Sequence, residues 1–284
     1  YGLFALIDYV ASSENLNYVD KTRIGATGHS AGGNAAIRAA NYFGREAQRT
    51  GQPSKLDSVY VSGYVLTLRD DVLGDVRSNV GVAYALYDEG AYRNELGTGD
   101  MRTAPEALRA VNSGLAPEDA VSEVEIGRFY GDKDDRTLRI VHNERVLHPF
   151  QPYMAEATAN QIAYFEHVFD WPSGLSTYDQ VWQWKEFLGV VSLIAGLVAL
   201  VPMGQLLLRT SWFSPLVKPV PGPLPRPAGR GRMLFWGTFV LAALVACFTY
   251  IPMAELSQKL FVAASTRQLT WFFPQRMNNA VMLW

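Results

Sequence analysis

The stretch Gly28-His29-Ser30-Ala31-Gly32-Gly33 decides the fold expected for this chain. The run before it, Lys21–Thr27, is short and ends in small residues, which predicts a β-strand. The alanine-rich run after it, Ala31–Phe43, predicts an α-helix. A serine flanked by glycines between a strand and a helix is typical of a nucleophile elbow, the sharp turn that lifts a serine hydroxyl out of a sheet.

The residues around the serine agree with that chemistry. A side chain at Gly28 or Gly32 is expected to collide with the adjacent helix or strand, so glycine is needed at both positions. The backbone N–H of Ala31 is expected at the helix N-terminus, where it can stabilise an oxyanion. The alternative is a tightly packed turn without chemistry. A phosphate-binding loop is disfavoured, because the sequence has neither a G-K-[ST] ending nor a G-x-G-x-x-G motif.

With this elbow the chain resembles the α/β-hydrolase superfamily, in particular its dienelactone-hydrolase-like and acetylhydrolase-like esterases, whose elbow commonly reads G-H-S-x-G-G. The resemblance covers about residues 1 to 168. It implies a doubly wound α/β sheet and a triad in the chain order serine, acid, histidine. The predicted fold is the C-terminal part of such a sheet, followed by transmembrane helices.

The acid is predicted from two downstream strands, Leu56–Leu66 and Asn79–Tyr87. The second of them ends directly at Asp88, and a carboxylate at the carboxyl end of a core strand shares a sheet edge with the elbow. Asp88 is therefore the predicted acid, and a solvated turn aspartate is the alternative. The rival acids are Glu89, Asp132, Asp134 and Asp135. The last three belong to a GDKDD stretch that predicts an exposed hairpin loop.

The base is chosen among four histidines. His29 is part of the elbow and is expected to point away from the serine, and His167 belongs to the predicted closing helix Met154–Phe169. His142 follows the predicted last strand. His148 lies in the loop between that strand and the closing helix, where the resemblance places the catalytic histidine. We therefore predict His148 as the base and keep His142, or a plain surface histidine at 148, as alternatives.

These residues together predict a serine hydrolase that cleaves esters through an acyl-enzyme. Ser30 attacks an acyl carbonyl, His148 accepts its proton, and Asp88 orients the imidazole. A carboxylesterase or lipase-like activity is expected, and thioesters and peptide bonds stay open as substrates. Neither a cofactor nor a metal site is predicted, since the sequence has no cluster with metal-ligand spacing.

The predicted organisation begins with residues 1–170 as the hydrolase portion, with a polar insertion at about residues 91–130. That insertion contains a helical stretch, Ala104–Val111, and is expected either to shape the acyl pocket or to form a surface excursion. Only about 20 residues precede the elbow strand, among them the predicted helix Tyr1–Ala11. The resemblance implies further strands and a second oxyanion N–H before that point, so the chain is expected to be a fragment or a processed form. Residues 171–185 are a predicted linker.

Residues 186–253 are predicted to form a transmembrane hairpin. Phe187–Leu208 and Met233–Met253 carry no charged residue, and at about 1.5 Å per residue each is long enough to cross the roughly 30 Å hydrocarbon layer. The connecting loop 209–232 is basic and has no acidic residue, which predicts a cytoplasmic loop and an extracytoplasmic hydrolase domain. Its basic residues are Arg209, Lys218, Arg226, Arg230 and Arg232.

The remaining observations limit the partners. Residues 254–284 predict an interfacial helix or the approach to a further span. The formal net charge of −2 gives no reason to expect nucleic-acid binding. The only cysteine, Cys247, lies inside the second span, so neither a disulfide nor a thiol nucleophile is expected in the hydrolase portion. The expected partners are an ester substrate, small or lipidic, and the bilayer.

The sequence suggests one alternative function and disfavours another. A hydrolase-like domain that has lost catalysis would serve as a binding or scaffolding module in a membrane protein. A transporter is disfavoured, because neither predicted span carries an ionisable residue that could line a pathway.

Overall fold

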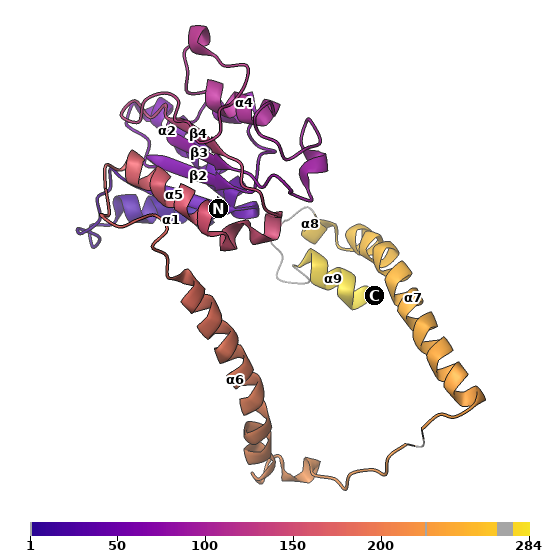
Figure 1. Ribbon diagram of the computed structural model, residues 1–284. Coiled ribbons are helices and arrows are strands. Elements are labelled where there is room, and N and C mark those ends of the chain that lie inside the picture. The colour runs from indigo at the N-terminus through magenta and orange to yellow at the C-terminus, as the bar shows by residue number, and fades with distance from the viewer. Residues whose placement is uncertain (1, 225, 266–274) are drawn as a thin grey trace. The chain divides into compact units, whose positions relative to one another are not determined.

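A computed structural model describes residues 2–224, 226–265 and 275–284. The chain divides into two compact units, Tyr1–Gly196 and Leu197–Trp284. The first is built on a four-stranded sheet with the strand order β1-β2-β3-β4 (Figure 1). Every neighbouring pair is parallel. The strands are β1 Gly25–His29, β2 Ser58–Ser62, β3 Asn79–Ala83 and β4 Arg139–His142.

Helices connect successive strands and cover the sheet. The helices of this part are α1 Gly2–Ser12, α2 Ala31–Thr50, α3 Asp70–Leu73, α4 Pro105–Asn112 and α5 Ala155–Val168, with 3-10 turns η1 Ala91–Arg93, η2 Pro117–Asp119 and η3 His148–Tyr153. The residues of β3 and β4 are all buried, as expected for parallel strands that are covered on both faces. The predicted α/β class is therefore confirmed.

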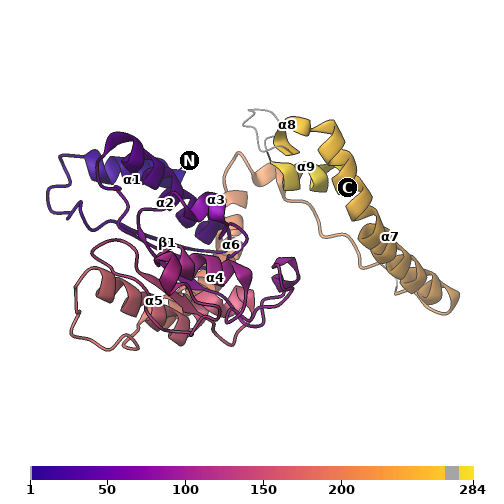
Figure 2. The ribbon, with the colours of Figure 1, turned by 90° about the horizontal axis from the view of Figure 1, so that it is seen from above.

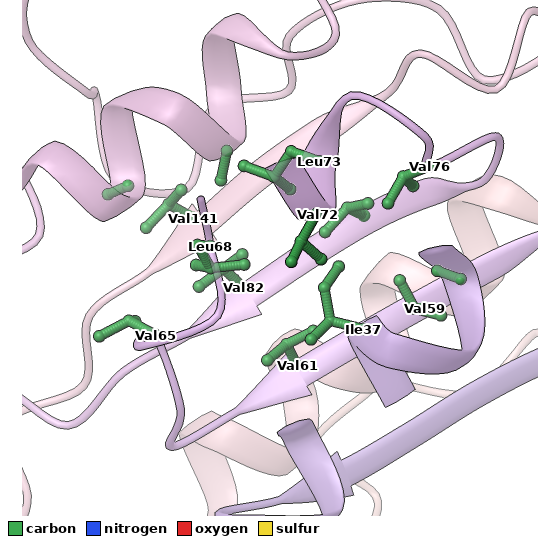
Figure 3. Close-up of a cluster of buried hydrophobic side chains, with 14 of the residues drawn as sticks. Ile37, Val59, Val61, Val65, Leu68, Val72, Leu73, Val76, Val82 and Val141 are labelled. Carbon is green, nitrogen blue, oxygen red and sulfur yellow. The ribbon is translucent and has the colours of Figure 1, made fainter. Parts of the chain in front are cut away.

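The two faces of the sheet have separate cores, because side chains alternate along each strand. Val59 and Val61 point into a cluster with Ile37 of α2, and α3 and α4 also contribute to it (Figure 3). Tyr60, between the two valines, points into a second cluster with Tyr164 of α5. Figure 2 shows α2 and α5 on opposite sides of the sheet.

The segment between β3 and β4 is partly core. The predicted helix Ala104–Val111 is present as α4, which packs against β3 and β4. Ala107 and Val111 are fully buried, and so is Met101 before the helix. A surface excursion is therefore wrong for this part of the insertion. Its apolar face is part of the first core cluster.

The two predicted spans are single long helices. They are α6 Trp182–Leu208, of 27 residues, and α7 Arg230–Leu260, of 31 residues, and both are long and apolar enough to cross a membrane. The 3-10 turn η4 Ser214–Leu216 lies between them, and α8 Val262–Ser265 and α9 Arg276–Leu283 follow. Within the second unit α9 packs against α7, where the Trp284 indole N–H donates to the carbonyl of Ala246 at 3.0 Å. Of the predicted segment 254–284, residues 266–274 lie outside the described residues.

Candidate active site

Ser30 occupies a sharp turn between β1 and α2. Its φ of 58° and ψ of −117° fall in a region that side-chain-bearing residues rarely adopt, and such strain persists only where the surroundings enforce it. The Ser30 N–H donates to the carbonyl of Ser62 at 2.8 Å, and the carbonyl of Ser30 accepts from the N–H of Asn34 at 3.1 Å. The strand–turn–helix expected for an elbow is therefore present around this serine.

Close packing explains two of the glycines in the turn. A Cβ on Gly28 would lie 2.3 Å from the carbonyl carbon of Gly32, and one on Gly33 would lie 2.8 Å from the carbonyl oxygen of Ser62. A Cβ on Gly32 would meet no atom within 4 Å. The predicted collision at Gly32 is therefore wrong. The close approach to the neighbouring strand occurs one residue later, at Gly33.

Ala31 is the first residue of α2, as predicted. Its N–H belongs to the first helical turn, whose N–H groups have no intrahelical partner. Within the described part of the chain, the Ser30 side chain gives that turn no capping hydrogen bond. The Ala31 N–H is thus placed where the partial positive charge of the helix N-terminus can act on an oxyanion.

Asp88 and His148 are in direct contact. The His148 Nδ1 lies 2.8 Å from Oδ2 of Asp88, while Oδ1 accepts from the backbone N–H of Gly90 at 2.7 Å. The Asp88 side chain is only 4% exposed and that of His148 is 23% exposed. Because a carboxylate only accepts hydrogen bonds, Nδ1 is the donor in this contact, and in the neutral imidazole Nε2 then carries the lone pair. This is the tautomer that a general base requires.

Backbone pairing beyond the strands brings the acid and the histidine together. After β3 and β4 end, the N–H of Leu86 donates to the carbonyl of Glu144 at 2.7 Å, and that of Tyr87 donates to the carbonyl of Val146 at 3.2 Å. The segments that carry Asp88 and His148 therefore run side by side up to the two side chains.

Glu144 links η3, which begins at His148, to α5 through hydrogen bonds. The sequence did not indicate these contacts. The buried carboxylate accepts from the amide of Gln151 at 2.9 Å and from that of Asn160, in α5, at 3.0 Å. Burial raises the pKa of Glu144, and the two amide hydrogen bonds oppose that shift. No local pattern distinguishes this glutamate from a surface acid, so only the tertiary structure identifies it.

His29 takes part in the site more closely than expected. Its Nδ1 lies 3.1 Å from Oγ of Ser62, and its ring centroid lies 4.5 Å from that of His148. Burial lowers the pKa of His29, and the charge of His148 lowers it further. The residue directly before the serine is thus in contact with His148, and its charged form is disfavoured. The Ser30 hydroxyl itself has no hydrogen-bond partner among the described residues.

The rival residues lie elsewhere. His142 ends β4 with its Nδ1 2.9 Å from the Tyr60 hydroxyl, and burial lowers the pKa of His142 to about 4. His167 is exposed and stacks on Phe129. Glu89 is also exposed. The three aspartates of the GDKDD loop are exposed as well, and Asp132 accepts hydrogen bonds from the backbone of the other two, Asp134 and Asp135.

A small polar cavity of about 240 Å³ adjoins the elbow. Its lining includes Gly28, His29, Gln151 and Gln161. Gln151 is fully buried, and its Oε1 has no hydrogen-bond partner in the described ranges. A hydrogen-bond donor on a bound molecule would satisfy that oxygen. Within those ranges no group of three or more His, Cys, Asp or Glu side chains could hold a metal ion.

Comparisons of the chain with protein-family models, with curated proteins and with solved structures find no match. The site itself consists of a serine in a strained turn, a histidine in contact with the residue before that serine, and a buried aspartate 2.8 Å from that histidine.

Proposed function

We propose that this chain is the catalytic and membrane-anchoring part of a serine hydrolase of the α/β-hydrolase superfamily, which cleaves esters of small molecules or lipids. Ser30 is the nucleophile, His148 the base and Asp88 the acid. The observation that carries the proposal is the 2.8 Å contact between His148 and Asp88, next to a serine held at positive φ. A triad carried on a nucleophile elbow combines these two features.

The reaction follows from these positions. Oγ of Ser30 attacks the acyl carbonyl while Nε2 of His148 takes its proton, and the N–H of Ala31 donates to the oxyanion that forms. The imidazolium then protonates the leaving alcohol, and the C–O bond breaks to give the acyl-enzyme. Water, deprotonated by the same imidazole, releases the acid and regenerates Ser30. Asp88 stabilises the imidazolium in both halves of the reaction.

The two apolar helices support an anchoring role in the bilayer. We assign the basic segment 209–232 between α6 and α7 to the cytoplasmic side, because short loops rich in Lys and Arg are retained there. The hydrolase portion before α6 then faces the extracytoplasmic space. Esters on that side of the membrane, including lipid esters, can then reach the site.

One observation favours a second candidate, a hydrolase-like binding module without catalysis. Among the described residues, nothing hydrogen-bonds to the Ser30 hydroxyl, and an activated serine needs its base within reach. In many hydrolases that hydrogen bond tightens only when substrate is bound. Reactivity of the serine therefore separates the two candidates.

The test is labelling of the full-length protein in membranes with a fluorophosphonate probe. Wild type is expected to label, while Ser30→Ala and His148→Ala lose the label. The matched controls are Ser122→Ala and His167→Ala, which change exposed residues away from the site and are expected to label like wild type. Wild-type protein that is folded by circular dichroism but does not label would favour the binding module.

A further inference from the structure

A buried arginine lies at the sheet edge opposite the serine. Arg139 is the first residue of β4 and is 2% exposed. Its Nη1 donates to the carbonyls of Ser78 at 3.1 Å and Leu138 at 2.8 Å, and its Nε donates to Oγ of Ser113 at 3.0 Å. In a parallel sheet the amino ends of the strands share one edge, so this arginine is remote from the elbow at the carboxyl edge.

The charge of Arg139 has no counter-ion in the described part of the chain. All its hydrogen-bond partners are neutral oxygens, and no carboxylate lies within ion-pair distance. Burial lowers its pKa to about 10, which leaves the guanidinium charged at neutral pH. Its Nη2 has no hydrogen-bond partner among the residues described. Burying a cation without a counter-ion is costly, and an anion bound to the guanidinium would reduce that cost.

Arg139 lines a cavity of about 550 Å³ whose charged lining consists of three arginines and one aspartate. Arg77 is exposed on the same cavity, with Nη1 donating to two backbone carbonyls and Nη2 free of any described partner. Arg136 is already paired with Asp57, at 3.2 Å. The aspartate is Asp135, an exposed residue of the loop before β4. Two guanidinium groups, those of Arg77 and Arg139, are thus left to bind a ligand.

We propose that this cavity binds a phosphate group, held by Arg139 and Arg77. Guanidinium groups recognise phosphate through paired N–H donors, and several oxygens of one phosphate can accept from two such groups at once. Ser113, which accepts from Nε of Arg139, lines the same cavity and fixes the guanidinium plane. The site is separate from the serine site and does not depend on the proposed hydrolysis.

A second cavity, of about 520 Å³, adjoins the first and shares Arg77 and Ser113 with it. Its lining includes Leu73 and Leu108. An organic group attached to the phosphate can extend along this apolar wall, whereas free phosphate would leave it empty. Free phosphate and a phosphomonoester would bind the two arginines in the same way. Only the phosphomonoester would also occupy the second cavity.

The experiment is isothermal titration of the full chain in detergent micelles, with inorganic phosphate and with phenyl phosphate at constant ionic strength. Saturable binding of at least one of them is expected, and binding at least tenfold weaker in Arg77→Gln, whose exposed side chain can change without loss of the fold. Arg38→Gln, an exposed arginine bonded to Asn34, is the matched control and is expected to bind like wild type.

The outcomes separate the possibilities. Tighter binding of phenyl phosphate identifies a phosphomonoester, and equal binding identifies free phosphate. No saturable heat with wild type, or equal affinity in Arg77→Gln and Arg38→Gln, would overturn the proposal. Arg139→Lys, which keeps the charge but loses the paired donors, is expected to weaken binding further, with circular dichroism to check its fold.

Discussion

The imidazoles of His29 and His148 lie in contact, with ring centroids 4.5 Å apart and planes inclined by 39°. His29 is the last residue of β1, directly before the turn that carries Ser30, and His148 is the first residue of η3, so this contact joins the strand before the proposed nucleophile to the 3-10 turn that carries the proposed base. His29 is fixed in turn by the hydroxyl of Ser62 on β2. His29 therefore lies between β2 and His148, in contact with both.

We expect His29→Ala to lower kcat for ester hydrolysis about tenfold or more while KM changes little. The variant keeps His148 but loses the ring contact that positions its imidazole. His29→Phe keeps a ring against His148 but loses the Ser62 hydrogen bond, and is expected to lie between wild type and the alanine variant. Steady-state kinetics with a chromogenic ester would measure both. Equal activity in all three proteins would show that the ring contact does not position His148.

The neighbouring carboxylates Asp88 and Glu89 allow a matched test of which residue is the acid of the proposed triad. Asp88→Asn is expected to lower kcat by up to about 10⁴, the loss measured for the equivalent change in a well-studied triad, since the amide favours the wrong histidine tautomer. Glu89→Gln changes an exposed side chain and should leave kcat within about twofold of wild type. The reverse pattern would assign the acid to Glu89.

The glycines of the elbow give a stability test that does not depend on activity. Gly28→Ala is expected to prevent folding of the domain or to lower its melting temperature strongly, because the new methyl would overlap the backbone of Gly32. Gly32→Ala points into open space within a helix and is expected to be neutral, or stabilising by up to about 1 kcal/mol. Thermal unfolding followed by circular dichroism compares the two. Equal melting temperatures would contradict the tight turn.

His142 predicts an acid-sensitive domain. Its pKa is about 4 in the folded protein and about 6.5 when unfolded, so the unfolded chain binds the extra proton first. Above about pH 6.5 His142 is neutral in both states and does not change the free energy of unfolding. As the pH falls from 6.5 toward 4, the free energy of unfolding decreases by about 3 kcal/mol in total. Denaturant unfolding across this range should show that slope, and His142→Gln should flatten it. An unchanged slope would place the acid sensitivity on other groups.

The orientation in the membrane can be tested at the segment between α6 and α7. In a Cys247→Ser background, a cysteine introduced as Lys218→Cys is expected to react with an impermeant maleimide only in inside-out vesicles. A cysteine placed in the hydrolase portion as Ser122→Cys should react only in right-side-out vesicles. The opposite labelling would reverse the proposed topology.

The local patterns of the sequence predicted much of this arrangement. A strand, a glycine-flanked serine and an alanine-rich helix follow one another as expected, although β1 begins later than predicted, at Gly25, and α2 continues to Thr50. The contact between Asp88 and His148 was also expected. The end of a predicted strand placed Asp88 at the carboxyl edge of the sheet, and the resemblance to α/β-hydrolases implied a histidine in the loop that holds His148. Local patterns are enough to place a residue when its position follows from the strand, turn or helix that carries it.

Features that depend on the tertiary structure were not predictable. The stretches Leu56–Leu66 and Asn79–Tyr87 are largely apolar. Only Ser58–Ser62 and Asn79–Ala83 form strands, since the length of the ladder is set by the neighbouring strands. The need for glycine at 33 rather than 32 depends on how closely α2 crosses β2. The links from Glu144 to α5 and from His29 to His148 join parts of the chain that no local pattern relates.

The backbone pairing of residues 84–87 with 142–146 has a consequence for divergence. Asp88 and His148 are assembled by β3, β4 and their extensions, whereas Ser30 is held by β1 and β2. A descendant that loses the serine would therefore keep an ordered aspartate–histidine dyad. Such a protein would stay folded without the proposed nucleophile, and a single reversion to serine would place that residue beside an Asp88–His148 pair that had kept its geometry.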